Sequence, residues 1–202
     1  MNIAEAIWQC LDKAVNRFNK SGDPQSLLCP RCENPKIKSE KAAASERAIG
    51  YRLAFYLESE MRSMGLASDV GPLAVDCEYN RHGAKLKTLG VEQRLKNIVE
   101  KARNKKWGEP DGDDDDFYVF SVAPDIVVHQ RKTDINNLLV VEIKKRSNPE
   151  SEEYDDLKLK LFTESKYDEG YGYKLGAWIV AEDECDPAKR ELKIIRKYKS
   201  EI

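Results

Sequence analysis

Three side chains in the middle of this sequence could act together on a bound cation. Asp125 follows Pro124 at the start of one apolar run, and Glu142 and Lys144 lie two positions apart in the next such run. Side chains two positions apart leave the same face of a β-strand. A carboxylate in an apolar strand costs free energy unless it is paired or holds a metal ion. We therefore expect Glu142, with Asp125 beside it, to take part in an ion pair or a metal site.

Each of these residues also has a purely structural interpretation. Glu142 and Lys144 could form a plain ion pair on an edge strand. Asp125 could start a strand or cap a turn. His129, which follows Asp125 in the same run, is more often a hydrogen-bonding partner than a catalytic base. The elements around these residues decide which interpretation applies.

The segment that carries the three residues has the pattern of a β-hairpin. Two runs rich in Val, Ile and Leu flank a polar turn at residues 132–137. Residues 173–181 are almost continuously apolar, as a strand buried on both faces is. Residues 73–81 alternate, as a strand with one polar face does, and residues 192–199 alternate weakly and close the domain as an edge strand. A helix predicted over residues 152–165 then implies a right-handed crossover between parallel strands.

Three further helices are predicted. Apolar residues at helical spacing indicate amphipathic helices over residues 3–18 and 39–64, the second with Gly65 at its C-cap. A helix over residues 91–107 carries the clearest basic cluster of the chain, made of Arg94, Lys96, Lys101, Arg103, Lys105 and Lys106. This cluster is either a solvated helix face or a contact with nucleic acid. The fold class is therefore α/β, with a mixed sheet flanked by helices and an added N-terminal helix.

Length and composition limit the class of protein. The 202 residues suit one domain over residues 39–202, preceded by a helix and a cysteine-containing connector over residues 1–38. The net charge is only −2, so any attraction to nucleic acid must come from a local patch. The chain has no apolar run long enough to span a membrane, and its N-terminus lacks the order of a signal peptide. We therefore expect a cytoplasmic protein.

The cysteines and the acidic run suggest little chemistry of their own. Five cysteines at irregular spacings predict reduced thiols rather than a disulfide framework. Cys29 and Cys32 have the spacing of half a zinc site, but no second pair follows to complete four ligands. Ordinary thiols in a turn and a zinc-supported interaction module both remain open. Residues 108–116 do not follow the calcium-loop spacing, which predicts a solvated acidic loop.

Two short motifs lie on consecutive predicted strands. The first is Pro124-Asp125, and the second is Glu142-Ile143-Lys144. This arrangement resembles the PD-(D/E)XK nuclease superfamily, whose restriction-endonuclease-like fold is found in many restriction and repair endonucleases. The sequence segments DCEYNR, PDIVVHQR and NNLLVVEIKK also resemble those of uncharacterised bacterial and phage members of that superfamily. The likeness covers most of the expected domain but neither the N-terminal helix nor the cysteine-containing connector.

The resemblance implies a role for each residue. Asp125 and Glu142 would hold Mg²⁺ or Mn²⁺, with the Ile143 carbonyl as a third oxygen ligand. Lys144 would orient or deprotonate the attacking water and offset the charge that develops during phosphodiester hydrolysis. Glu46 resembles the acidic residue that the first helix of the superfamily often contributes as a further ligand.

Two further candidates have less support from the pattern. Glu78, on the strand expected beside Asp125, is a weaker candidate ligand, and Lys158 is a candidate contact to phosphate. An ordinary exposed glutamate is the alternative for both Glu46 and Glu78. The acid-any-base triplet is not specific, because residues 156–158, 164–166 and 191–193 fit it equally well. Only Glu142-Ile143-Lys144 lies on an apolar strand directly after a Pro-Asp strand.

These observations support two functions from different classes. The first is a Mg²⁺-dependent nuclease acting on DNA, with Arg94, Lys101, Lys105, Lys106 and Lys158 as contacts to nucleic acid. Cutting both strands would need a homodimer or two visits, and the N-terminal helix either mediates self-association or packs on its own core. The second is a catalytically inactive nucleic-acid-binding or scaffold subunit of a phage-defence or mobile-element assembly.

Overall fold

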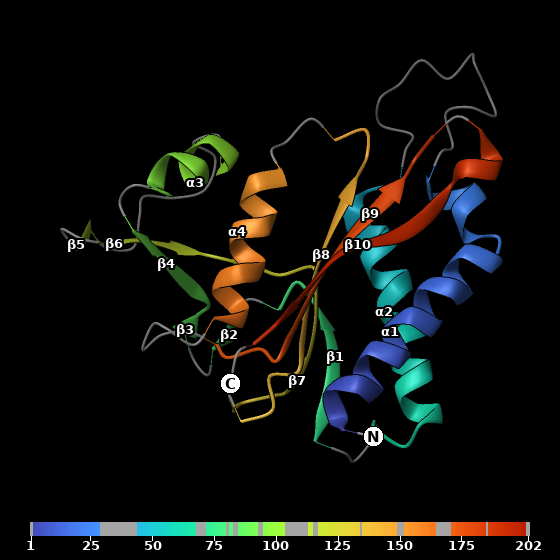
Figure 1. The fold of residues 1–202 in the computed structure, drawn as a ribbon, viewed down its shortest axis with the longest axis horizontal. Coiled ribbons are helices and arrows are strands. Elements are labelled where there is room, and N and C mark those ends of the chain that lie inside the picture. The colour runs from blue at the N-terminus through green and yellow to red at the C-terminus, as the bar shows by residue number, and fades with distance from the viewer. Residues whose placement is uncertain are drawn as a thin grey trace.

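The computed structural model has a mixed five-stranded sheet with α1 and α2 on one face and α4 on the other (Figure 1). This is the α/β class predicted from the sequence. The structure describes residues 2–28, 44–67, 72–79, 81–82, 85–92, 95–103, 113–114, 117–133, 135–148, 152–164, 171–184 and 186–200. In this part of the chain, no helix combines the length and the apolar character needed to cross a bilayer.

The strands of the central sheet lie in the order β1-β7-β8-β9-β10, and their bounds are Leu73–Cys77, Ile126–Gln130, Leu139–Lys145, Leu175–Glu182 and Glu191–Lys199. As predicted, β7 and β8 form an antiparallel hairpin. The helix α4 (Glu152–Thr163) connects β8 to β9, which are parallel. Every residue of β9 is buried, whereas β10 forms an edge of the sheet. The predicted helical connection between parallel strands and the predicted edge strand are therefore both confirmed.

The two faces of β8 serve two separate cores. Leu139, Val141 and Ile143 pack into the core that contains α1 and α2. Val140 packs into the second core, which contains residues of α4. Because side chains alternate along a strand, Glu142 and Lys144 share the face of Val140. The two charged residues therefore point toward α4.

The helix α1 (Ile3–Lys20) begins with a capping box between Asn2 and Glu5. Its apolar residues Ile7, Leu11 and Phe18 are fully buried in the core shared with α2 and the sheet. Self-association and packing on its own core were both predicted for this helix, and the structure shows the packing. Its first apolar residue, Ile3, is exposed.

The helix α2 (Glu46–Ser63) is shorter at its start than predicted. The Ser45 hydroxyl accepts a hydrogen bond from the backbone N–H of Ala48, which caps the helix there. Residues 39–43 of the predicted helix lie outside the described part of the chain. At the other end, Gly65 has a positive φ of 70°, as expected of a glycine that terminates a helix.

The prediction of a helix over residues 91–107 is wrong at its start. Val91 lies in β4 (Thr88–Glu92), where it is buried and pairs with Tyr118 of β6 (Phe117–Ser121). Strand pairing outweighs the helical pattern here, and α3 (Lys96–Arg103) begins only at Lys96. Residues 104–107 of the predicted helix lie outside the described part of the chain. The expected acidic loop contains a two-residue strand, β5 (Asp113–Asp114), also paired with β6.

The strand predicted over residues 73–81 ends earlier, because Glu78 adopts a left-handed φ of 49°. Four short elements complete the described fold: β2 (Arg81–His82), β3 (Lys85–Leu86), and the helical turns η1 (Pro24–Leu28) and η4 (Pro187–Lys189). Cys10 and Cys77 are free thiols. Cys29 and Cys32 lie outside the described residues, so the two interpretations of that pair stay open.

Candidate active site

Asp125 and Glu142 lie side by side where β7 begins and β8 approaches its end. The antiparallel register pairs Ile126 with Val141, so Asp125 and Glu142 are the next two residues opposite each other on the two strands. The Asp125 Oδ2 atom accepts a hydrogen bond of 2.6 Å from the backbone N–H of Ile143. The N–H and C=O of one strand residue point to the same edge of the strand. The Ile143 carbonyl therefore faces the side of β8 on which Asp125 lies, as a third oxygen ligand would require.

The Glu142 carboxylate is buried, with 2% of the residue exposed. One of its oxygens, Oε2, accepts a hydrogen bond of 2.7 Å from the Lys158 ammonium. The other oxygen, Oε1, is buried and has no hydrogen-bond donor among the described residues. Buried carboxylate oxygens are normally paired, so an oxygen without a donor is a candidate position for a cation.

Negative charge is in excess around these two carboxylates. Desolvation raises the pKa of Asp125 to about 6, against the opposing effects of Lys158 and the Ile143 N–H. Desolvation also raises the pKa of Glu142 well above its usual range, and the charges of Asp125 and Asp155 add to this effect. A raised carboxyl pKa means that the ionised form lacks compensation. The pair therefore favours the approach of a cation or a proton.

Lys144 is held in place by a residue that the sequence patterns did not single out. Its ammonium lies 3.4 Å from Asp155 Oδ2, and both side chains are 9% exposed. The other oxygen of Asp155 lies 3.0 Å from the Lys158 ammonium. Asp155 therefore bridges the two lysines. One signal could have found it, because Asp155, Lys158, Leu159 and Phe162 have the i, i+3, i+4, i+7 spacing of a buried helix face.

Glu46 reaches the same end of β8 from the first turn of α2. Its Oε1 atom accepts hydrogen bonds from the backbone N–H of Lys145 at 2.8 Å and from the Asn148 amide at 2.9 Å. It is also close enough to raise the pKa of Asp125. The structure thus brings Glu46 to the site, but at least one of its oxygens is engaged by the backbone and Asn148.

Glu78 is less favourably placed. Its side chain forms an ion pair with Arg47 at 2.5 Å, and its backbone N–H donates to the carbonyl of Asp125. Its carboxylate is thus paired with Arg47, and its contact with the site is a hydrogen bond to the backbone of Asp125. This arrangement favours a structural role for Glu78 over that of a metal ligand.

The predicted contacts to nucleic acid are only partly described. Lys101 is exposed on α3, whereas Arg94, Lys105 and Lys106 lie outside the described residues. Lys158 differs from the expectation, because it is only 8% exposed and pairs with Glu142. Its place on the buried face of α4 explains why: its ammonium points into the carboxylate cluster and not to the surface.

His129 is a structural partner, as the commoner interpretation of this residue type predicted. Its Nε2 atom lies 2.9 Å from Asp76, which also forms an ion pair with Arg131. Burial alone would raise the pKa of Asp76, but hydrogen bonds from Arg131 and His129 hold it well below its usual range. This cluster lies along β1 and β7, where Asp76 pairs with both His129 and Arg131.

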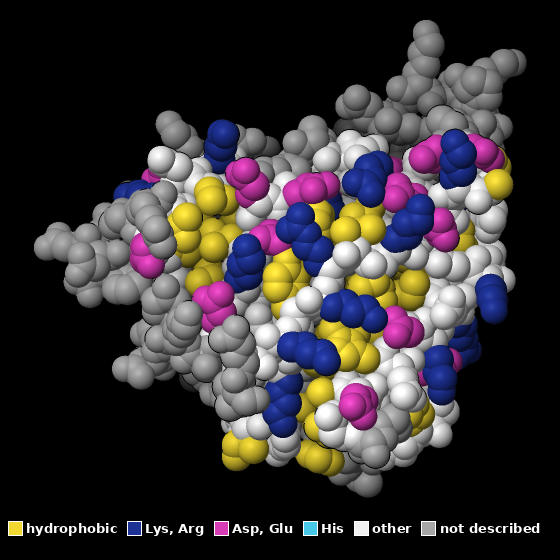
Figure 2. All heavy atoms as spheres, viewed as in Figure 1, with side chains coloured by type: hydrophobic (Ala, Val, Ile, Leu, Met, Phe, Trp, Pro, Cys, Tyr) yellow, Lys and Arg dark blue, Asp and Glu magenta, His cyan; other side chains and the backbone are white. Residues whose placement is uncertain are grey.

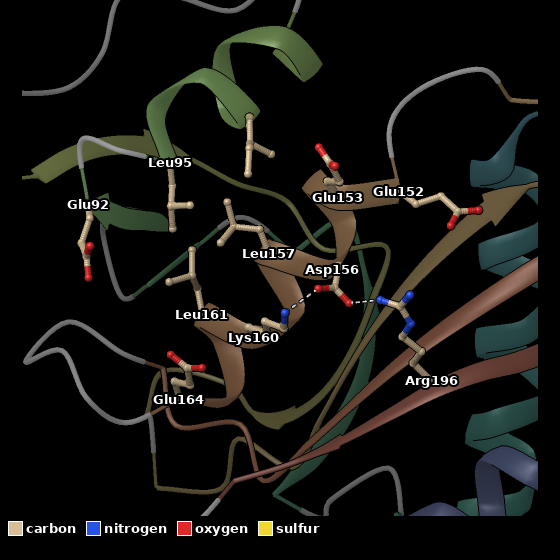
Figure 3. Close-up of a pocket in the computed structure, with 11 residues that line it drawn as sticks. Glu92, Leu95, Glu152, Glu153, Asp156, Leu157, Lys160, Leu161, Glu164 and Arg196 are labelled. Atoms are coloured by element: carbon tan, nitrogen blue, oxygen red, sulfur yellow. Dashed lines mark hydrogen bonds and ion pairs between the residues drawn. The ribbon is translucent and has the colours of Figure 1, made fainter.

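A hollow of about 500 Å³ lies elsewhere, between α3, α4, β4 and β10 (Figure 3). The residues of α4 that line it include Glu153, Asp156 and Lys160, on the other side of the helix from Asp155 and Lys158. None of the predicted metal ligands lines this hollow. The candidate site, a buried cluster at the end of β8, is therefore separate from this hollow.

The oxygen donors at this cluster would suit an ion such as Mg²⁺ or Mn²⁺, which takes part of its coordination shell from water. They would not suit a metal whose ligands all come from the protein. Among the described residues, no group of three or more His, Cys, Asp and Glu side chains could hold a metal ion. Mg²⁺ commonly binds through one or two carboxylates and completes its shell with water and substrate phosphates. Asp125, Glu142 and the Ile143 carbonyl could supply such an incomplete shell. Comparison of the chain with protein-family models, curated proteins and solved structures gives no match.

Proposed function

We propose that this chain is a nuclease that hydrolyses phosphodiester bonds in DNA with Mg²⁺ or Mn²⁺ as its cofactor. The observation that carries the proposal is the buried Glu142 oxygen without a donor, next to Asp125 and on the same strand face as Lys144. A restriction-endonuclease-like arrangement of the sheet is part of the same proposal. The excess of carboxylates over ammonium groups at this point supports it, because a divalent cation would supply the missing positive charge.

Asp125, Glu142 and the Ile143 carbonyl would hold the ion, and Glu46, on α2, would contribute through a water molecule. When bound, such an ion stabilises negative charge on phosphate oxygens and lowers the pKa of a coordinated water. Lys144 lies two residues beyond Glu142 on the same face, so its ammonium can donate a hydrogen bond to the attacking water or to a phosphate oxygen. Asp155 keeps the Lys144 side chain from turning away, which makes Asp155 a positioning residue.

The proposal is tested by incubating the protein with plasmid, linear duplex, single-stranded DNA and RNA in the presence of Mg²⁺ or Mn²⁺. Lys144→Ala should lower the cleavage rate by about 10²- to 10⁴-fold, the range expected for a lost general acid-base or charge-stabilising group. Lys160→Ala is the matched control, because this lysine is half exposed on the outer face of α4. Cleavage by Lys144→Ala at the wild-type rate would contradict the assignment.

The inactive scaffold is the second candidate, and one observation favours it. The Lys158 ammonium already satisfies one oxygen of Glu142, so the carboxylate has a partner without any metal. A titration with Mn²⁺ separates the two functions. A nuclease should bind the ion and lose it in Glu142→Ala, whereas a scaffold should show no binding that depends on Glu142.

A further inference from the structure

The proposed hydrolysis gives no role to Lys158, the buried lysine beside Glu142. It is 8% exposed, its ammonium lies 2.7 Å from Glu142 Oε2 and 3.0 Å from Asp155 Oδ1, and it lies 5.0 Å from the centre of the Tyr154 ring. It also interacts electrostatically with Asp125. A buried lysine needs compensating charge, and both proposed carboxylate ligands of the metal contribute to it.

A divalent ion and the Lys158 ammonium would compete for the same carboxylate. The two oxygens of Glu142 belong to one delocalised anion, so an ion on Oε1 lies close to an ammonium on Oε2. Water screens this repulsion weakly, because Glu142 and Lys158 are both buried. The two cations therefore weaken each other's binding to Glu142.

Asp155 offers the ammonium another partner. It lies three residues before Lys158 on α4, so the two side chains emerge from the same face of the helix. This pair can persist when the contact with Glu142 is lost. A small rotation of the Lys158 side chain would suffice, because the ammonium already contacts both carboxylates.

The geometry points to Lys158 as a built-in competitor of the divalent cation: its ammonium neutralises Glu142 and withdraws to Asp155 when the ion binds. This inference rests on the proposed function, because it assigns a regulatory residue to the same site. It implies that the protein exchanges one cation for another at Glu142. Metal affinity is then set by Lys158 and Asp155 as well as by the ligands.

The test is calorimetric titration with Mn²⁺ in the absence of nucleic acid. Lys158→Met keeps most of the length of the side chain and removes its charge, so Mn²⁺ should bind about tenfold more tightly than to the wild type. Lys160→Met, on the exposed face of the same helix, should bind Mn²⁺ as the wild type does. Binding to Lys158→Met that is equal to or weaker than wild type would overturn the inference.

Asp155→Asn tests the same exchange from the other side and does not depend on the folding of Lys158→Met. Without the Asp155 charge, Lys158 should stay on Glu142, and Mn²⁺ should bind about tenfold more weakly. This loss should disappear when Asp155→Asn is combined with Lys158→Met, because position 155 then no longer has the Lys158 ammonium to receive. A loss that persists in the double variant would mean that the Asp155 carboxylate attracts or binds the ion itself, and it would contradict the exchange.

The outcomes separate this inference from the proposed function. If the wild type and Lys158→Met bind Mn²⁺ equally well, the exchange is wrong and the nuclease proposal stands. If Lys158→Met binds Mn²⁺ and the wild type does not, the competition is supported, because the Lys158 ammonium then excludes the ion completely. If none of the variants nor the wild type binds Mn²⁺, both the exchange and the metal-dependent function fail.

Discussion

The two faces of α4 carry the same residue types in opposite surroundings. On the inner face, Asp155 and Lys158 lie 3.0 Å apart and are about nine-tenths buried. On the outer face, Asp156 and Lys160 lie 2.7 Å apart, and the lysine side chain is 51% exposed. The distances alone would rank the outer pair as the stronger. Burial reverses the ranking, because water screens the outer charges and leaves the inner ones to compensate each other.

The consequences for protonation differ in the same way. Burial alone would lower the pKa of Lys158, but the charges of Glu142 and Asp155 raise it well above its usual range. Burial would raise the pKa of Asp156, but hydrogen bonds from Lys160, Tyr198 and Arg196 lower it. Figure 3 shows Asp156 between Lys160 and Arg196, and Figure 2 shows Lys and Arg side chains interleaved with Asp and Glu on this side of the molecule. The outer charges form a mixed surface, whereas the inner ones belong to the buried cluster proposed as the active site.

The largest expected effect on stability is that of Lys158→Met. It leaves buried carboxylates without their cation, so the free energy of unfolding should fall by about 3–5 kcal/mol. Lys160→Met should change it by less than about 1 kcal/mol, because its ion pair is exposed. Urea unfolding of both variants at neutral pH measures the difference. Equal losses in the two variants would show that the contrast between the faces of α4 has no energetic basis.

A smaller effect is expected from Asp125→Asn, and it should depend on pH. The Asp125 carboxyl has a pKa of about 6 in the folded protein, against 3.8 as its ordinary value. Between these values the folded state binds more protons than the unfolded state, so wild-type stability falls as the pH rises from about 4 to 6. Asparagine keeps an acceptor for the Ile143 N–H and carries no charge. The variant should therefore be more stable than wild type above pH 6, by on the order of 1–2 kcal/mol.

Unfolding of Asp125→Asn and wild type should be compared at several pH values between 4 and 8 without added metal. The two proteins should differ little near pH 4, where Asp125 is protonated in the folded state. The same substitution should abolish Mn²⁺ binding if Asp125 is a ligand. A variant less stable than wild type at pH 7 would indicate that the ionised Asp125 is compensated after all.

The smallest expected effect belongs to the outer face. Asp156→Asn should lower stability by about 1 kcal/mol at neutral pH, because Asp156 is 15% exposed and its partners Lys160 and Arg196 are half exposed. The pKa of Asp156 is lowered in the fold, so its contribution should be present above pH 3.8 and lost as the pH falls further. Thermal unfolding in low and high salt checks this prediction, since salt should reduce the difference. An effect as large as that of Lys158→Met would contradict it.

The strands and helices of the core could be predicted because their signals are local. The apolar run of β9, the hairpin turn between β7 and β8, and the spacing of Ile7, Leu11 and Phe18 each follow from neighbouring residues. The error at Val91 has a non-local cause. Its strand exists because β6, more than twenty residues later, pairs with it. A helical pattern read over one segment cannot include that partner.

The sequence by itself determined the candidate site residues, because Asp125, Glu142 and Lys144 are fixed by strand order and by the two-residue period of a strand. Only the tertiary structure decided that Lys158 points inward to Glu142 and that Asp155 bridges the two lysines. Acidic residues in the first turn of α4 are equally well explained by the helix dipole, which does not distinguish Asp155 from Glu153. The rotation of the helix against the sheet makes that distinction, and it is set by the packing of Leu159 and Phe162 into the core.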